Sequence, residues 1–352
     1  MITEQPIHID LTLPQGWNQC TTPQLEMIAA TILRHTQRQD RYHPFDWLQV
    51  KAELFFLLTE THPLPLPMME GSGNSASQED NDKTFLVAFN DRRPWWKKLF
   101  APLHHREGLG VGPFPIATWQ VLSFIEQHLA WIDDEKAAPL LRFPYKERIV
   151  TREWHLHRTR WNIPVPCLQR VTHGPTDGLL QDYQWHEYSH LQQLMERYVT
   201  LQNRAATSAG KAATPAGKAT VPAGSPAGEI RAARNRFLAT LFRCTDHPQL
   251  VAAITDIEFQ VILFWWSGFM HYLMQHYPRC FKQAGGKSKN RKSANRKSPN
   301  PLDLYTSVIA TMQTQAHLSE ESINGQTFHI VLEQLERLAK QNEEMEKISK
   351  KH

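Results

Sequence analysis

Apolar residues recur three or four positions apart along much of the chain, which is the spacing of one helix face. The first such stripe comprises Leu25, Ile28, Ala29, Ile32 and Leu33. Thr21 or Thr22 can cap the helix that carries it, and Pro23 suits the first turn because its missing N–H is not needed there. A second helix is predicted from Pro44, with apolar residues on one side at Trp47, Val50, Leu54 and Leu57.

The same spacing predicts helices through most of the remaining chain. They are expected over residues 116–132, through the segment His186–His190, over residues 229–243 and 248–277, and from Pro301 and Thr327. Strand-like patterns are scarce and are confined to Ile7–Leu13, Thr84–Phe89 and Arg152–Trp161, the last of which predicts a strand or one arm of a hairpin. So few strands cannot form a large sheet. The sequence therefore predicts a mainly-α fold, with a bundle-like helical core and a minor β element.

Polar tracts of low complexity divide the chain. Residues 204–228 form a near-repeat of Ala, Gly, Lys, Pro and Thr, and residues 283–300 are rich in Ser, Asn and basic residues. Neither can bury much apolar surface, so both are predicted to be disordered loops. With a polar linker at 70–82, they delimit an N-terminal helical segment (1–69), a central α region with minor β (83–203), an apolar helical region (229–282) and a C-terminal helical pair (301–352).

The net charge of +4 belongs to one of these loops. Six basic residues and no acid lie between positions 287 and 298, and removing six positive charges from +4 leaves −2. The loop could touch phosphates nonspecifically by counterion release, or it could be a solvated linker. The six residues are Lys287, Lys289, Arg291, Lys292, Arg296 and Lys297.

The 4 cysteines lie far apart and form no C-x-x-C pair, so they signal neither a zinc knuckle nor a disulfide framework. We therefore expect a cytoplasmic protein. The N-terminus lacks the layout of a secretory signal. The most apolar stretch, Leu250–Met274, is interrupted by Asp256, Glu258 and Gln260, so we expect no membrane span.

The segment His186–His190 reads H-E-x-x-H, the pattern of a helical zinc site. Two imidazoles four residues apart could hold Zn²⁺, while Glu187 acts as general base on a bound water. The helix pattern argues against this reading. Tyr188, Leu191 and Leu194 begin its apolar stripe, and both histidines fall about 100–140° away from the stripe, on the side turned to water.

A zinc site also needs a third ligand, and none follows in the expected place. Gln193 and Glu196 stand where a metzincin needs Gly and His. A carboxylate from a later helix is another source, with Glu229, Asp256 and Glu258 as candidates, and a site that adds His155 and His157 is also conceivable. With 18 histidines in the chain, a chance match to so short a pattern is unremarkable.

Two segments are candidate partner-binding surfaces. Trp95 and Trp96 lie among basic residues, which suits stacking on bases or anchoring at a surface, and equally a helix start whose tryptophans pack inward. The C-terminal helix carries a heptad seam of Phe328, Val331, Leu335, Leu338, Asn342 and Met345 with charged flanks. Leu335, Leu338 and Met345 are the expected contacts of that seam.

Part of the chain resembles a loosely defined group of uncharacterised helical proteins from bacterial prophage-like loci. The resemblance rests on residues 174–185, on the helix that follows to about Tyr198, on Leu238–Arg243 and on the pattern from Leu302 to Glu346. In that group the positions of His186 and His190 are not characteristically histidine. The resemblance implies a role for some members in tail assembly, as chaperones or adaptors, and it transfers no catalytic residue.

Taken together, these patterns predict a non-catalytic protein that acts by protein–protein contact and needs no cofactor. Its expected setting is the assembly of a phage-derived or tail-like particle. The alternative is a zinc metallopeptidase with His186 and His190 as metal ligands and Glu187 as general base.

Overall fold

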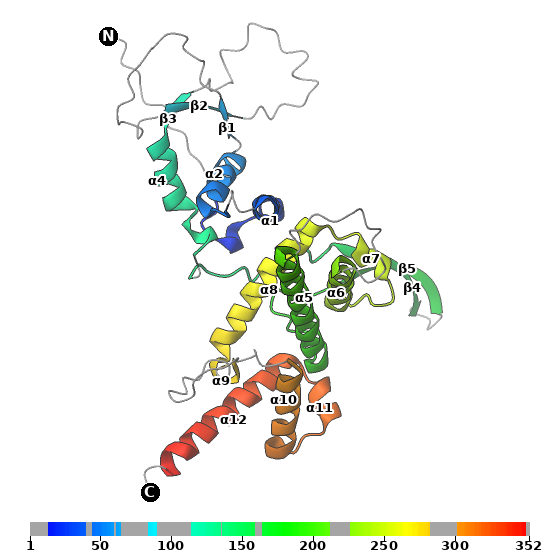
Figure 1. Cartoon of the computed structure of the whole chain (residues 1–352). Coiled ribbons are helices and arrows are strands. Elements are labelled where there is room, and N and C mark those ends of the chain that lie inside the picture. The colour runs from blue at the N-terminus through cyan, green and yellow to red at the C-terminus, as the bar shows by residue number, and fades with distance from the viewer. Residues whose placement is uncertain are drawn as a thin grey trace, which may run out of the picture. The chain divides into compact units, whose positions relative to one another are not determined.

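The protein is mainly helical with a minor β component, as predicted (Figure 1). The structure is a computed structural model, and it describes residues 13–39, 44–59, 61–64, 84–89, 114–134, 136–158, 164–211, 226–281 and 301–349. Two compact units, Met1–Pro139 and Leu140–His352, divide the chain. The predicted strand Ile7–Leu13 lies almost entirely outside the described residues.

The described part of the first unit contains helices and a small sheet. Its elements are η1 (Trp17–Gln19), α1 (Thr22–Arg38), α2 (Trp47–Leu58), β1 (Thr61–Leu64), β2 (Thr84–Phe89), β3 (Phe114–Ala117), α4 (Thr118–His128) and η4 (Ala130–Ile132). The strands pair antiparallel in the order β1-β2-β3. Thr21 caps α1 as predicted, because its side chain accepts from the Gln24 amide while the Gln24 side chain accepts from the Thr21 amide. Residues 116 and 117, expected at the start of a helix, pair instead with β2, so α4 begins at Thr118.

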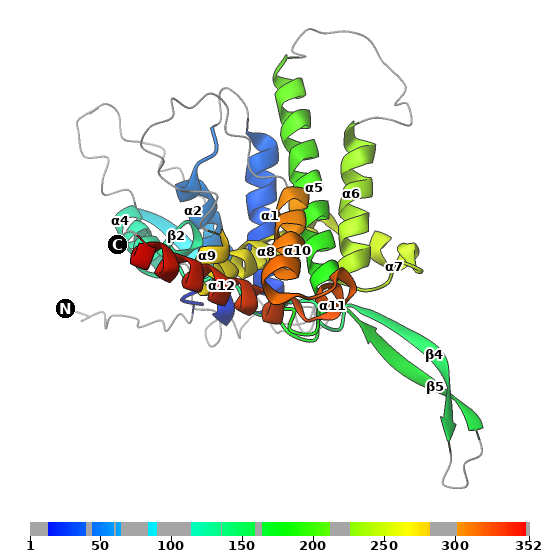
Figure 2. The same ribbon diagram turned by 90° about the horizontal axis from the view of Figure 1, so that it is seen from below.

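The second unit contains a β-hairpin and a set of helices. Its elements are β4 (Ile149–Arg158), β5 (Pro164–His173), α5 (Trp185–Lys211), α6 (Pro226–Leu241), α7 (Pro248–Ala252), α8 (Asp256–His276), α9 (Pro278–Phe281), α10 (Pro301–Ala316), α11 (Glu320–Gly325) and α12 (Phe328–Ser349). β4 and β5 pair antiparallel along their whole length and project away from the helices (Figure 2). β4 contains most of the segment Arg152–Trp161, which was predicted as a strand or one arm of a hairpin, whereas the residues of the other arm, β5, were not predicted as a strand.

The long apolar helix expected over residues 248–277 is interrupted. Thr255 accepts a hydrogen bond from the Glu258 amide, and the Glu258 carboxylate accepts one from the Thr255 amide, which starts α8 afresh after α7. Conversely, α5 extends into the Ala-rich tract as far as Lys211, consistent with the high helix propensity of alanine. The residues between Lys211 and Pro226 lie outside the described part.

Aromatic side chains of α5, α8 and α12 pack together within the core of the second unit. The Tyr188 ring stacks on the Phe328 ring with centroids 4.5 Å apart, and Phe269 meets Phe328 edge-on. The backbone also joins the start of α5 to the segment just before α12, since the Trp185 amide donates to the Gln326 carbonyl over 2.8 Å. The start of α5 is therefore held from two sides, by α8 and by the start of α12.

Candidate functional site

The H-E-x-x-H segment forms the first turns of α5, and its two histidines are exposed, as the helical spacing predicts. His186 Nδ1 lies 3.0 Å from the backbone oxygen of Asn324, within hydrogen-bonding distance. Tyr188 and Ser189, between the histidines, are buried. The apolar side of the segment thus anchors α5 in the core, while its imidazoles face outward.

Glu187 is held by an arginine. Its carboxylate accepts hydrogen bonds from Arg243 Nε over 2.9 Å and from Arg243 Nη2 over 2.7 Å, and it also accepts from the Gln184 amide over 2.9 Å. Partial burial opposes ionisation, but these hydrogen bonds outweigh it, so the pKa of Glu187 lies below its ordinary value. Glu187 therefore acts as an ionised anchor for the start of α5.

Arg243 connects three parts of the second unit. Besides Glu187, its guanidinium donates to the Asp182 carboxylate and to the Asp182 backbone oxygen, each over 2.8 Å. It also lies over the Tyr183 ring, 4.1 Å from the centroid, and the Tyr183 hydroxyl donates to the Leu241 carbonyl. One side chain after the end of α6 thus fixes both the loop before α5 and the first turn of α5.

No third zinc ligand joins the two histidines within the described part of the chain, where no group of three or more His, Cys, Asp and Glu side chains could hold a metal ion. Glu258 accepts from Arg148 over 2.5 Å, Asp256 forms an ion pair with Arg234, and Glu229 is exposed. The side chains of His155 and His157 lie outside the described residues.

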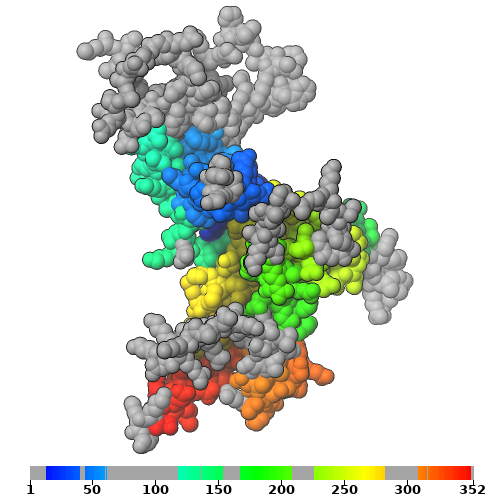
Figure 3. Space-filling view, viewed as in Figure 1, coloured from blue at the N-terminus to red at the C-terminus, as the bar shows by residue number. Residues whose placement is uncertain are grey.

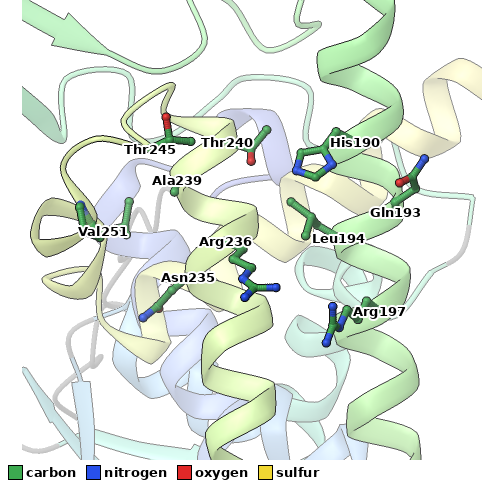
Figure 4. Close-up of a pocket in the computed structure, with 11 residues that line it drawn as sticks. His190, Gln193, Leu194, Arg197, Asn235, Arg236, Ala239, Thr240, Thr245 and Val251 are labelled. Atoms are coloured by element: carbon green, nitrogen blue, oxygen red, sulfur yellow. The ribbon is translucent and has the colours of Figure 1, made fainter.

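A groove lies between α5 and α6, which run side by side in opposite directions (Figure 2), and His190 lines it. Its volume is about 600 Å³. His190, Arg197, Arg236 and Thr240 point into the space between the two helices (Figure 4). The lining residues are His190, Gln193, Leu194, Arg197, Asn235, Arg236, Ala239, Thr240, Thr245, Pro248 and Val251. None of them is acidic.

Neither arginine of the groove has a carboxylate partner among the described residues. Arg234, two residues before Arg236 on α6, differs because it pairs with Asp256 and donates to the Thr255 carbonyl over 3.0 Å. The groove therefore combines positive charge with polar donors, and it presents no acid to a bound cation.

The other predicted site residues fall into two groups. Leu335 and Leu338 are half-buried on α12, whereas Met345 is 67% exposed. Trp95 and Trp96 lie outside the described residues, and so does the basic loop with Lys287, Lys289, Arg291, Lys292, Arg296 and Lys297.

Comparison of the chain with models of known protein families, with curated proteins and with solved structures found no match. The comparisons therefore assign no family, and the resemblance to helical proteins of prophage-like loci stays a prediction. Among the described helices, none is long and apolar enough to cross a membrane.

The sequence pattern did not reveal the groove. It placed both histidines of the H-E-x-x-H segment on the polar side of their helix, but Arg236 comes from another helix that the pattern could not position beside the first. The available signal was Arg236 itself. It has no acidic residue three or four positions away in the sequence, so no carboxylate on the same helix face is placed to pair with it.

Proposed function

We propose that this chain is a non-catalytic interaction protein that binds a helix of a partner protein with the free end of α12. One observation carries the proposal: residues 340–349, near the red end of the colour scale in Figure 3, are helical and exposed at every position. The exposed positions include the large apolar side chains of Met345 and Ile348, which are 67% and 54% exposed.

The two halves of α12 are built differently. In the first half Phe328, Val331 and Leu332 are buried, and the Glu336 carboxylate accepts from Arg279 Nη1 over 2.8 Å. In the second half, Arg279 lies 3.2 Å from the carboxylate of Glu343, whose side chain is 45% exposed. Solvent screens an exposed ion pair of this kind, so the pair contributes little to the stability of the helix end.

The exposed half suits a helical partner. Leu338, Asn342 and Met345 follow at intervals of four and three, so they lie along one helix face and span about 10 Å of it. Charged residues of both signs flank the face, and a polar residue at Asn342 can fix the register of two paired helices. We therefore infer a partner helix with an apolar seam and charged flanks.

The narrower setting, an assembly chaperone or adaptor in a phage-derived or tail-like particle, is proposed from the sequence resemblance alone. We also propose a cytoplasmic location. The 4 cysteines are free thiols, which is ordinary for proteins of a reducing compartment. The zinc metallopeptidase alternative has no support in the described geometry, because Glu187 is held by Arg243 and a third ligand is missing there.

Position-specific cross-linking tests the proposal. A photo-reactive phenylalanine analogue at Met345 should give a discrete adduct in the cells that express the protein, and the same analogue at Lys347 should not. These two positions lie about 160° apart around the helix. Sedimentation velocity then distinguishes a second copy of the chain from another protein. Equal adducts at both positions, or none at Met345, would contradict the proposed seam.

A further inference from the structure

The groove between α5 and α6 has the chemistry of an anion site. Arg197 from α5 and Arg236 from α6 point into it from opposite walls, with His190 near one end (Figure 4). Both arginines are exposed, and none of the lining residues is a carboxylate that could neutralise their charge. An anionic group between them would accept a charge-assisted hydrogen bond from each guanidinium.

The donors favour a phosphate group over other anions. A guanidinium presents a planar fork of N–H donors that matches two oxygens of a phosphate. Arginines on opposite walls can each engage a different pair of phosphate oxygens, whereas a carboxylate has only two oxygens in one plane. The Thr240 hydroxyl points into the same space and can donate a further hydrogen bond (Figure 4).

The groove also has room and apolar surface for more than a phosphate. Its volume of about 600 Å³ falls within the range of small-molecule sites. Leu194 and Val251 are buried and line it, together with the half-buried Ala239. A continuous nucleic-acid strand would instead call for a longer basic track along the surface.

We propose that this groove binds a small phosphorylated molecule. Arg197 and Arg236 hold its phosphate group, and the side formed by Leu194, Ala239 and Val251 takes its organic part. The proposal is independent of the partner surface on α12, because the groove and the free end of α12 share no residue.

Titration calorimetry of the full chain with phenyl phosphate, inorganic phosphate and benzoate tests this. Phenyl phosphate should bind at one site per chain, inorganic phosphate more weakly, and benzoate more weakly than phenyl phosphate. Arg236→Gln and Arg197→Gln should each raise the Kd for phenyl phosphate about tenfold, the typical effect of losing a charge-assisted contact. Arg197→Lys should recover part of the affinity, since it restores the charge without the fork.

Arg231→Gln is the matched control, because Arg231 is exposed on the same helix as Arg236 and does not line the groove. It should change the Kd less than twofold. An equal loss in Arg231→Gln would mean that only net charge attracts the ligand, and absence of saturable binding would also overturn the proposal. Binding of a single-stranded oligonucleotide that is tighter than phenyl phosphate and sensitive to Arg236→Gln would assign the groove to nucleic acid.

Discussion

Helices α5 and α12 start in the same place in the fold and end in different surroundings. Their first turns meet, with Tyr188 stacked on Phe328 and a β-bridge joining Gln184 to Thr327. Further along, α5 runs beside α6 and leaves a polar groove there, whereas the last ten residues of α12 are exposed at every position. In both helices, therefore, the first turns contribute to the stability of the unit, and the later turns offer a surface for binding.

Phe328→Ala should cause the largest loss of stability. The side chain is fully buried and contacts the rings of Tyr188 and Phe269, so its removal leaves a cavity at the point where the helices meet. We expect a loss of about 4 kcal/mol in the free energy of unfolding, measured by urea denaturation. Ile330→Ala is the control, because Ile330 is 45% exposed on the same helix, and it should cost about 0.5 kcal/mol or less. Similar losses in both variants would mean that the start of α12 is not packed as described.

Gly178→Ala should cost about 3 kcal/mol, because the added methyl group would overpack the loop before α5. A Cβ at this position would lie 1.6 Å from the Leu141 backbone oxygen. The Gly178 carbonyl also accepts from the indole N–H of Trp265 over 2.9 Å, so a shift of the loop breaks that hydrogen bond too. Thermal denaturation measures the loss. Gly325→Ala is the control, since nothing lies within 4 Å of a Cβ there, and a loss as large as that of Gly178→Ala would contradict the close approach.

Glu187→Gln should have a smaller effect, which depends on pH. Near neutral pH we expect a loss of about 1 kcal/mol, since the charge-assisted hydrogen bonds from Arg243 weaken. The pKa of Glu187 is lowered in the folded state, so its stabilising contribution is present above the unfolded pKa and is lost as the pH falls through the folded pKa. The difference between wild type and variant, measured by urea denaturation at pH 7 and at pH 3, should therefore shrink at the lower pH. A constant difference would mean that the carboxylate charge is not what holds Arg243.

Truncation after Ala339 should have the smallest effect on stability, about 0.5 kcal/mol or less. It removes the exposed half of α12, including the partly exposed ion pair between Arg279 and Glu343. Thermal denaturation and circular dichroism should show an otherwise intact fold, while binding to the partner helix is lost. A cooperative collapse of the unit on truncation would instead mean that this end of α12 is part of the core.

Local signals predicted the helices better than their mutual arrangement. The spacing of Leu25 and Ile28, with Thr21 before them, predicted α1 and its cap, because these interactions lie within a few residues of one another. The start of α8 was also local, since Thr255 and Glu258 form a recognisable capping box, but the surrounding apolar run concealed it.

Of the groove between α5 and α6, only the α5 side could be predicted from the sequence. The outward direction of His190 and Arg197 follows from the periodicity of α5. The presence of Arg236 across from them depends on how α6 packs against α5, which no pattern within either helix specifies. The same holds for Glu187, whose partner Arg243 is 56 residues away.

The hydrogen bond between His329 Nε2 and the Leu179 carbonyl spans 150 residues of sequence. The Phe328 amide likewise donates a hydrogen bond to the carbonyl of Tyr183, far earlier in the sequence. During translation, the loop before α5 leaves the ribosome long before the segment that completes its hydrogen bonding. Non-local closure of this kind slows folding. The aromatic side chains around Tyr188 therefore lack their contacts with α12 until that helix has been synthesised.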